Sequence, residues 1–132
     1  MIKIVAGTCI QIRARGMEDY HLYFVITDPV GNPQEVALVN LTSYRPNIDD
    51  SAVFDVADHP NITQKSMINY AGAQVAPVES LQMYVTANPR RLKPSCSPKM
   101  LQTIRDGFWK TDATAKKMRT FCDGLFKSKF KP

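Results

Sequence analysis

The sequence predicts a mainly β domain with C-terminal helices, built as a small, strongly bent barrel followed by two α-helices. Short apolar segments alternate with turn residues over the first 86 residues, and helical spacing begins after residue 97. The chain has 132 residues, with 44% hydrophobic and 22% charged residues, which fits one globular domain and excludes a disordered chain. We expect residues 1–86 to form the barrel and residues 87–132 to form a Pro-rich basic connector and two amphipathic helices packed on the same domain.

The strands are expected in this order. Residues 2–6 form the first strand, which can extend to Ile12. Residues 22–27 are rich in aromatic and β-branched side chains, and Asp28-Pro29 ends them. Residues 31–33 complete a turn, and residues 35–42 return as the partner strand of a hairpin. Residues 52–56 and 81–85 are weaker strand candidates.

The two helices begin at polar capping residues. Ser97-Pro98 places serine at an N-cap and proline at the first helical position. Thr111-Asp112 predicts the start of the second helix. Apolar residues then recur at helical spacing, at Met100, Leu101, Ile104 and Phe108 in the first helix and at Met118, Phe121, Cys122 and Leu125 in the second.

Positive charge gathers in the last third of the chain. Residues 1–89 carry a net charge of −4, and residues 90–132 carry +9. This asymmetry indicates either a surface that meets phosphates or an acidic partner, or a solvated helix face. The candidate nucleic-acid-binding residues are Arg45, Arg90, Arg91, Lys116, Lys117 and Arg119.

Cysteine usage and hydropathy bear on the compartment. The three cysteines are widely spaced with no CxxC motif, which predicts a reduced cytoplasmic location. The N-terminus lacks the apolar run of a signal peptide, and no window approaches a membrane span, so no membrane partner is expected. The acidic residues near His59 are more simply explained by turns and strand ends than by a metal site, and we expect no metal and no cofactor.

Two polar segments carry the candidate chemistry. His21 opens one strand of the hairpin while Thr42 and Ser43 close the other, so the three side chains are expected at one rim of the sheet. His21 could instead serve only as a structural strand cap. Residues 58–70 add His59, Lys65 and Ser66, a mixture suited to binding a phosphodiester, or else a polar loop that leads into a strand.

The strand pair of residues 21–28 and 36–43 resembles the core of the PemK/MazF-like toxins, in which one strand follows an Arg-Pro pair and the next ends in a hydroxyl pair. Residues 58–70 and 101–107 are similar to a divergent PemK-like branch. The resemblance covers most of residues 1–107 and not the final helix. It implies an SH3-like barrel, often dimeric, that acts as a metal-independent endoribonuclease on single-stranded RNA and is neutralised by a cognate antitoxin protein.

The resemblance assigns the family's arginine to His21 and its catalytic threonine to Thr42. Histidine shuttles protons near neutral pH but is a poorer permanent charge for phosphate, and Tyr20-His21-Leu22 lacks the proline. The leading hypothesis is therefore a toxin-like endoribonuclease with His21, Thr42, Ser43, His59, Lys65 and Ser66 at its site. The alternatives are a non-enzymatic SH3-like module that holds nucleic acid or an acidic protein on its basic helices, and a toxin of the same barrel that poisons a protein target.

Overall fold

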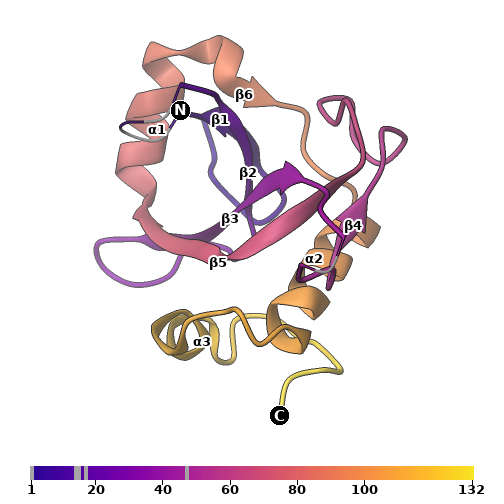
Figure 1. Ribbon diagram of the computed structural model, residues 1–132. Helices are drawn as coiled ribbons and strands as arrows, with labels where there is room; N and C mark the ends of the chain where they lie inside the picture. Colours follow the sequence, from indigo (N-terminus) through magenta and orange to yellow (C-terminus); the bar gives the residue numbers. More distant parts are fainter. Residues whose placement is uncertain (1, 14–15, 17, 47) are drawn as a thin grey trace.

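One curled antiparallel sheet is the centre of the molecule (Figure 1). The computed structural model describes residues 2–13, 16, 18–46 and 48–132, and within them six strands pair in the order β4-β5-β3-β2-β1-β6. Their bounds are β1 Cys9–Ile12, β2 His21–Val25, β3 Glu35–Ser43, β4 Val53–Phe54, β5 Ser66–Pro77 and β6 Leu92–Lys93. The expected curled β-sheet with C-terminal helices is confirmed at this level.

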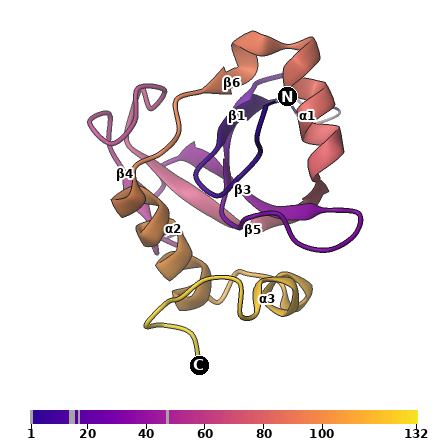
Figure 2. The ribbon, with the colours of Figure 1, turned by 180° about the vertical axis from the view of Figure 1, so that it is seen from behind.

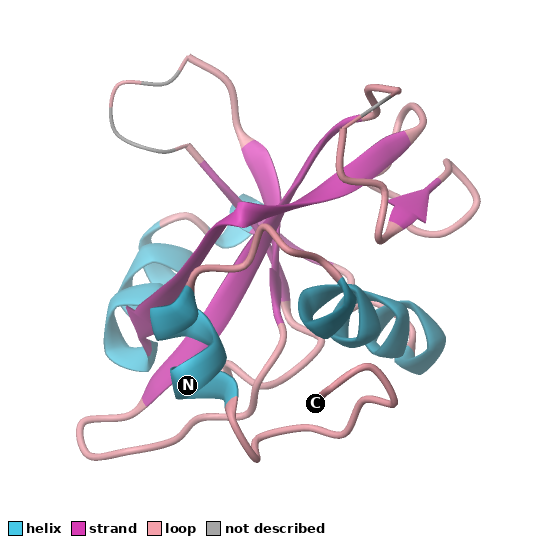
Figure 3. Cartoon of the chain, turned by 60° about the horizontal axis from the view of Figure 1, so that its bottom comes forward, coloured by secondary structure: helices cyan, strands magenta, loops and turns pink. Residues whose placement is uncertain are grey.

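Helices lie on both sides of the strands (Figure 3). The described part of the chain contains three α-helices, α1 Val78–Ala87, α2 Pro98–Lys110 and α3 Lys116–Cys122, and a short 3₁₀ turn, η1 Pro89–Arg91. Helix α1 falls where residues 81–85 were expected to be a strand, so that prediction is wrong. Val78, Leu81 and Val85 are its buried residues, and their spacing of three and four residues is that of one helix face. No helix in the described segments is long and apolar enough to cross a membrane.

The sheet buries both of its faces. Successive residues of a strand point to opposite faces, so Phe24 packs with Ile104 and Phe108 of α2 while Val25 packs with Val85 of α1. In Figures 1 and 2, α1 lies on one side of the curled sheet, and α2 and α3 lie on the other side. This double burial explains why β2 and β3 read as continuous apolar runs rather than as alternating strands.

The predicted hairpin is confirmed. Strands β2 and β3 pair with Phe24 opposite Val39. The first strand begins at Cys9 and not at residue 2, because the backbone turns where the Thr8 N–H donates to the Val5 carbonyl (3.0 Å). The predicted strand at residues 52–56 is present as the short β4.

Of the two predicted helix starts, the first is confirmed and the second is wrong. Ser97 caps α2 as expected, since its hydroxyl oxygen accepts from the Met100 N–H (3.0 Å). Helix α3 begins at Lys116 and not at Thr111, so the predicted start is wrong. The Thr111 hydroxyl accepts from the Ala113 N–H (3.1 Å) and donates to the Asp49 carboxylate, which places this threonine in a turn.

Candidate functional site

An open cleft of about 440 Å³ lies where β2 begins and β3 ends. It is lined by Gln11, Asp19, Tyr20, His21, Leu22, Leu41, Thr42, Ser43, Asn61, Thr63, Gln64 and Ser66. The sequence-predicted residues His21, Thr42, Ser43 and Ser66 are thus brought together. The antiparallel register produces this grouping, because Tyr23 pairs with Asn40 and the next strand positions run towards the same rim.

His21 lines the cleft and uses one of its two ring nitrogens to fix the position of the ring. Its Nδ1 lies 3.3 Å from the Leu41 carbonyl oxygen. A carbonyl oxygen only accepts, so Nδ1 carries the hydrogen and, in the neutral ring, Nε2 holds the lone pair. The half-buried His21 can therefore accept a proton at Nε2.

The opposite wall of the cleft is tied to the end of β3 by a side-chain bridge. The Gln64 amide donates to the Ser43 hydroxyl oxygen (2.9 Å). Ser66 is buried, and its hydroxyl donates to the Gln64 carbonyl (2.8 Å). Ser66 thus shapes the wall, while Ser43 still has its own hydroxyl hydrogen to offer a ligand.

His59 is placed beneath this wall and not in the cleft. Its side chain is only 3% exposed, and its ring packs edge-on against Phe24 at 6.3 Å between ring centroids. Nδ1 accepts from the Asn61 N–H (3.0 Å) and Nε2 donates to the Pro94 carbonyl (2.6 Å). With both nitrogens engaged, His59 positions the cleft-lining Asn61 and has no face towards a substrate.

Lys65 also lies outside the cleft lining. It is exposed, and its Nζ sits 4.1 Å from the centroid of the Tyr44 ring. The Lys65 carbonyl accepts from the Tyr44 N–H (3.1 Å), which fixes its backbone beside the end of β3. The ammonium is therefore held by a cation–π contact near the cleft.

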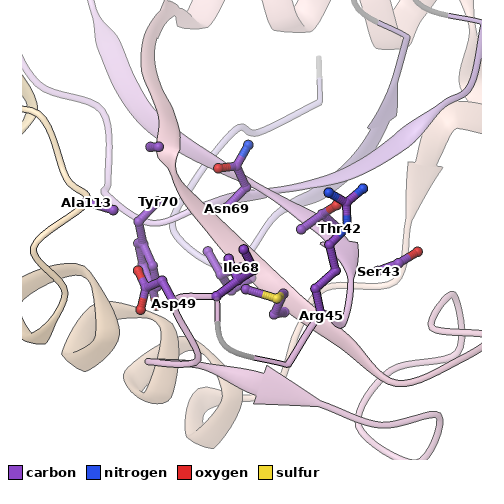
Figure 4. Close-up of a pocket in the computed structure, with 11 residues that line it drawn as sticks. Thr42, Ser43, Arg45, Asp49, Ile68, Asn69, Tyr70 and Ala113 are labelled. Carbon is purple, nitrogen blue, oxygen red and sulfur yellow. The ribbon is translucent and has the colours of Figure 1, made fainter.

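A second cleft of about 290 Å³ shares Thr42 and Ser43 with the first (Figure 4). It is lined by Thr42, Ser43, Arg45, Ile48, Asp49, Met67, Ile68, Asn69, Tyr70, Ala71 and Ala113. The hydroxyl pair therefore separates two hollows, with His21 in one and Arg45 in the other. Arg45 is exposed and brings a permanent positive charge to this rim.

Asp49 lies at the other end of the second cleft, beside Tyr70 (Figure 4). Burial opposes ionisation of this carboxyl, but hydrogen bonds from Ser51 and Thr111 outweigh burial and lower the pKa of Asp49. Burial, with the nearby charges of Asp49 and Asp106, raises the pKa of Tyr70. The Tyr70 hydroxyl donates to the Ile104 carbonyl (2.8 Å), so this bond ties β5 to α2 through a protonated Tyr70.

The predicted basic residues are spread over separate parts of the surface. Lys116 and Lys117 are exposed on α3, and Arg90 is exposed on η1. Arg119 is half-buried and donates from Nη2 to the Thr111 carbonyl (2.6 Å), which ties α3 to the end of α2. None of these four lines either cleft.

Arg91 reaches the His21 cleft through an aromatic stack that was not predicted. Its Cζ lies 3.5 Å from the centroid of the Tyr20 ring, and Arg13 lies over the same ring at 5.5 Å. Arg91 Nη1 also donates to the Gln11 side chain (3.3 Å). Recognising that Ile12 pairs with His21 would have placed Arg13 beside Tyr20, so the missing signal was the pairing of the first strand with β2.

No three His, Cys, Asp or Glu side chains come together as a metal site in the part of the chain that the structure describes. The acidic segment near His59 is used locally instead. The Asp55 N–H donates to the Asp58 carboxylate (2.7 Å), and the Ser51 N–H donates to Asp49 (3.1 Å). These carboxylates close turns.

Comparison of the chain with protein-family models, with curated proteins and with solved structures finds no match in any of the three.

Proposed function

We propose that the protein is a toxin-like, metal-independent endoribonuclease that cleaves single-stranded RNA on an SH3-like, PemK/MazF-like barrel. One observation carries the proposal: His21, with Nε2 as its lone-pair nitrogen, shares a polar cleft with the hydroxyls of Thr42 and Ser43. The resemblance of these strands to the toxin core supports the same assignment.

The chemistry follows from the roles of these groups. His21 Nε2 takes the proton of a ribose 2′-hydroxyl, whose oxygen attacks the adjacent phosphorus. The hydroxyls of Thr42 and Ser43 donate to the phosphorane oxygens, and Arg45 adds positive charge beyond them. The bond to the 5′-oxygen breaks, that oxygen takes a proton from water in the open cleft, and a 2′,3′-cyclic phosphate remains.

The test is cleavage of a fluorescently labelled single-stranded RNA in the presence of a metal chelator. We expect the wild-type protein to cleave. His21→Ala should lose at least about 100-fold in rate, the usual contribution of a general base, and Thr42→Ala should lose about 100-fold through loss of a donor to the phosphorane. Thr86→Ala, an exposed threonine of α1 outside both clefts, is the matched control and should cleave normally. Intact RNA after prolonged incubation with folded wild-type protein would refute the proposal.

A non-enzymatic binding module is the second candidate, favoured by the exposed Lys116 and Lys117 on α3. It predicts RNA binding that weakens steeply with salt and depends on these lysines, with no effect of His21→Ala. Binding of that kind without cleavage would select this function over the ribonuclease.

A further inference from the structure

Cys9 and Cys96 meet in the interior although 86 residues separate them along the chain. Cys9 lies in β1, and Cys96 lies in the connector between β6 and α2. Both bond to one carbonyl, that of Gly7, which accepts from the Cys96 N–H (3.0 Å) and from the Cys9 thiol (3.4 Å). Both side chains also belong to the same buried cluster. The fold therefore brings two thiols together at a fixed place.

The two thiols differ in exposure and in acidity. Cys9 is 0% exposed, whereas Cys96 is 9% exposed. The hydrogen bond with Cys9 lowers the pKa of Cys96 and the Arg105 charge lowers it further, against an opposing effect of burial. The same contact, together with burial, raises the pKa of Cys9. Cys96 is thus the nucleophile of the pair, and it is also the thiol that lies nearer the surface.

We propose that Cys9 and Cys96 form a redox site, in which hydrogen peroxide converts the two thiols to an intramolecular disulfide. The Cys96 thiolate attacks one peroxide oxygen, the O–O bond breaks, and hydroxide leaves, giving Cys96 sulfenic acid. The Cys9 sulfur then attacks the Cys96 sulfur, the S–O bond breaks, and the hydroxyl leaves with the Cys9 proton as water. The two thiols lose two electrons, which reduce the peroxide.

Cys122 is the competing thiol, and its surroundings disfavour it. It is fully buried on α3, and burial raises its pKa to about 12 despite the opposing charge of Arg105. A thiol in that state is a poor nucleophile at neutral pH. The site therefore comprises Cys9 and Cys96.

Cys96 is connected to the His21 cleft through two residues of backbone and two hydrogen bonds of His59. Cys96 follows Pro94 by two residues, and the Pro94 carbonyl accepts from His59 Nε2 (2.6 Å). His59 Nδ1 in turn holds the N–H of Asn61, which lines the cleft. Fixing Cys96 to β1 should therefore restrict opening of the cleft wall, whatever reaction the cleft supports.

The experiment is titration of the reduced full-length protein with hydrogen peroxide, followed by thiol counting in denaturant and non-reducing peptide mapping. We expect the count to fall from three thiols to one, with Cys9 and Cys96 in one linked peptide pair. In the Cys122→Ser variant, the thiol count should fall from two to zero. The Cys9→Ser variant should form no intramolecular disulfide. The oxidised wild type should melt roughly 10 °C higher, and its residues 59–66 should exchange amide hydrogens about tenfold more slowly.

The wild-type peptide map decides the outcome even if a cysteine variant fails to fold. A disulfide that includes Cys122, a disulfide between two molecules, or Cys96 oxidised to sulfinic acid without a disulfide would each overturn the assignment. A Cys9–Cys96 disulfide that leaves exchange of residues 59–66 unchanged would overturn the connection to the cleft. None of these measurements requires the protein to cleave RNA.

Discussion

The two histidines are expected to respond to truncation in opposite ways. In His59→Ala, the Pro94 carbonyl and the Asn61 N–H lose their partners, and each such loss at a buried group costs about 1–3 kcal/mol. Removal of the ring from its contact with Phe24 adds a cavity. We therefore expect His59→Ala to lose about 3–5 kcal/mol of unfolding free energy. His21→Ala removes one 3.3 Å hydrogen bond at a half-buried position and should lose less than about 1 kcal/mol.

The assay pairs urea unfolding, followed by circular dichroism, with RNA cleavage under conditions where each variant stays folded. His21→Ala should unfold nearly as the wild type does and lose at least about 100-fold in cleavage rate. His59→Ala should be strongly destabilised, with its cleavage rate within about tenfold of the wild type because the ring does not reach the cleft. A His59→Ala protein of normal stability and no activity would refute the assignment of His59 as a positioning residue, and it would restore the catalytic role that the sequence predicted.

Three further substitutions test the packing that holds the clefts. Gly107→Ala should lose about 2–4 kcal/mol of stability, because its Cβ would lie 2.0 Å from the Tyr70 hydroxyl oxygen and would displace a buried ring; normal thermal unfolding would contradict this contact. Asp49→Asn should lose about 1–2 kcal/mol at pH 7. The folded state lowers the pKa of Asp49, so its contribution is present above the ordinary carboxyl pKa and disappears as the pH falls through the folded-state value; wild type and variant should therefore converge in acid denaturation below about pH 4. Ser97→Ala should lose about 1 kcal/mol by urea unfolding, since it removes the cap of α2.

The hairpin of β2 and β3 was predictable because its signals are local. Aromatic and β-branched residues cluster in residues 22–27, turn residues follow at 28–33, and the partner strand begins within a few positions. The register between β2 and β3 then follows from the position of the hairpin turn. The meeting of His21 with Thr42 and Ser43 in one cleft could therefore be predicted from the sequence.

Strand β5 could not be predicted because its stability comes from distant pairing. It contains Asn69 and Gly72 and ends at Pro77, all residues with low strand propensity. Its twelve residues are held by β3 along most of their length, with a register shift beside Asn40. Pairing with β3, and not the composition of β5, therefore stabilises this strand.

The rest of the cleft was missed for the same reason. Asn61, Thr63 and Gln64 form its wall only because Gln64 bonds to Ser43 and because buried His59 holds Asn61 against the connector. Polarity marks residues 58–66 as a loop but does not distinguish a catalytic histidine from one that positions its neighbours. Burial makes that distinction, and burial depends on the connector at Pro94, 35 residues away.

The distribution of positive charge along the chain indicates which part of the protein would attract an RNA phosphate. Residues 1–89 carry −4 and residues 90–132 carry +9, so most of the positive charge lies in the basic third, and Arg45 adds one charge at the rim of the second cleft. Lys116 and Lys117 line neither cleft, whereas Arg91 stacks on Tyr20 and bonds to Gln11, both of which line the His21 cleft. A guanidinium has five N–H donors, so one bond to Gln11 leaves others for a phosphate. The connector that carries Arg91 is therefore the part of the basic third that lies against the lining of the His21 cleft.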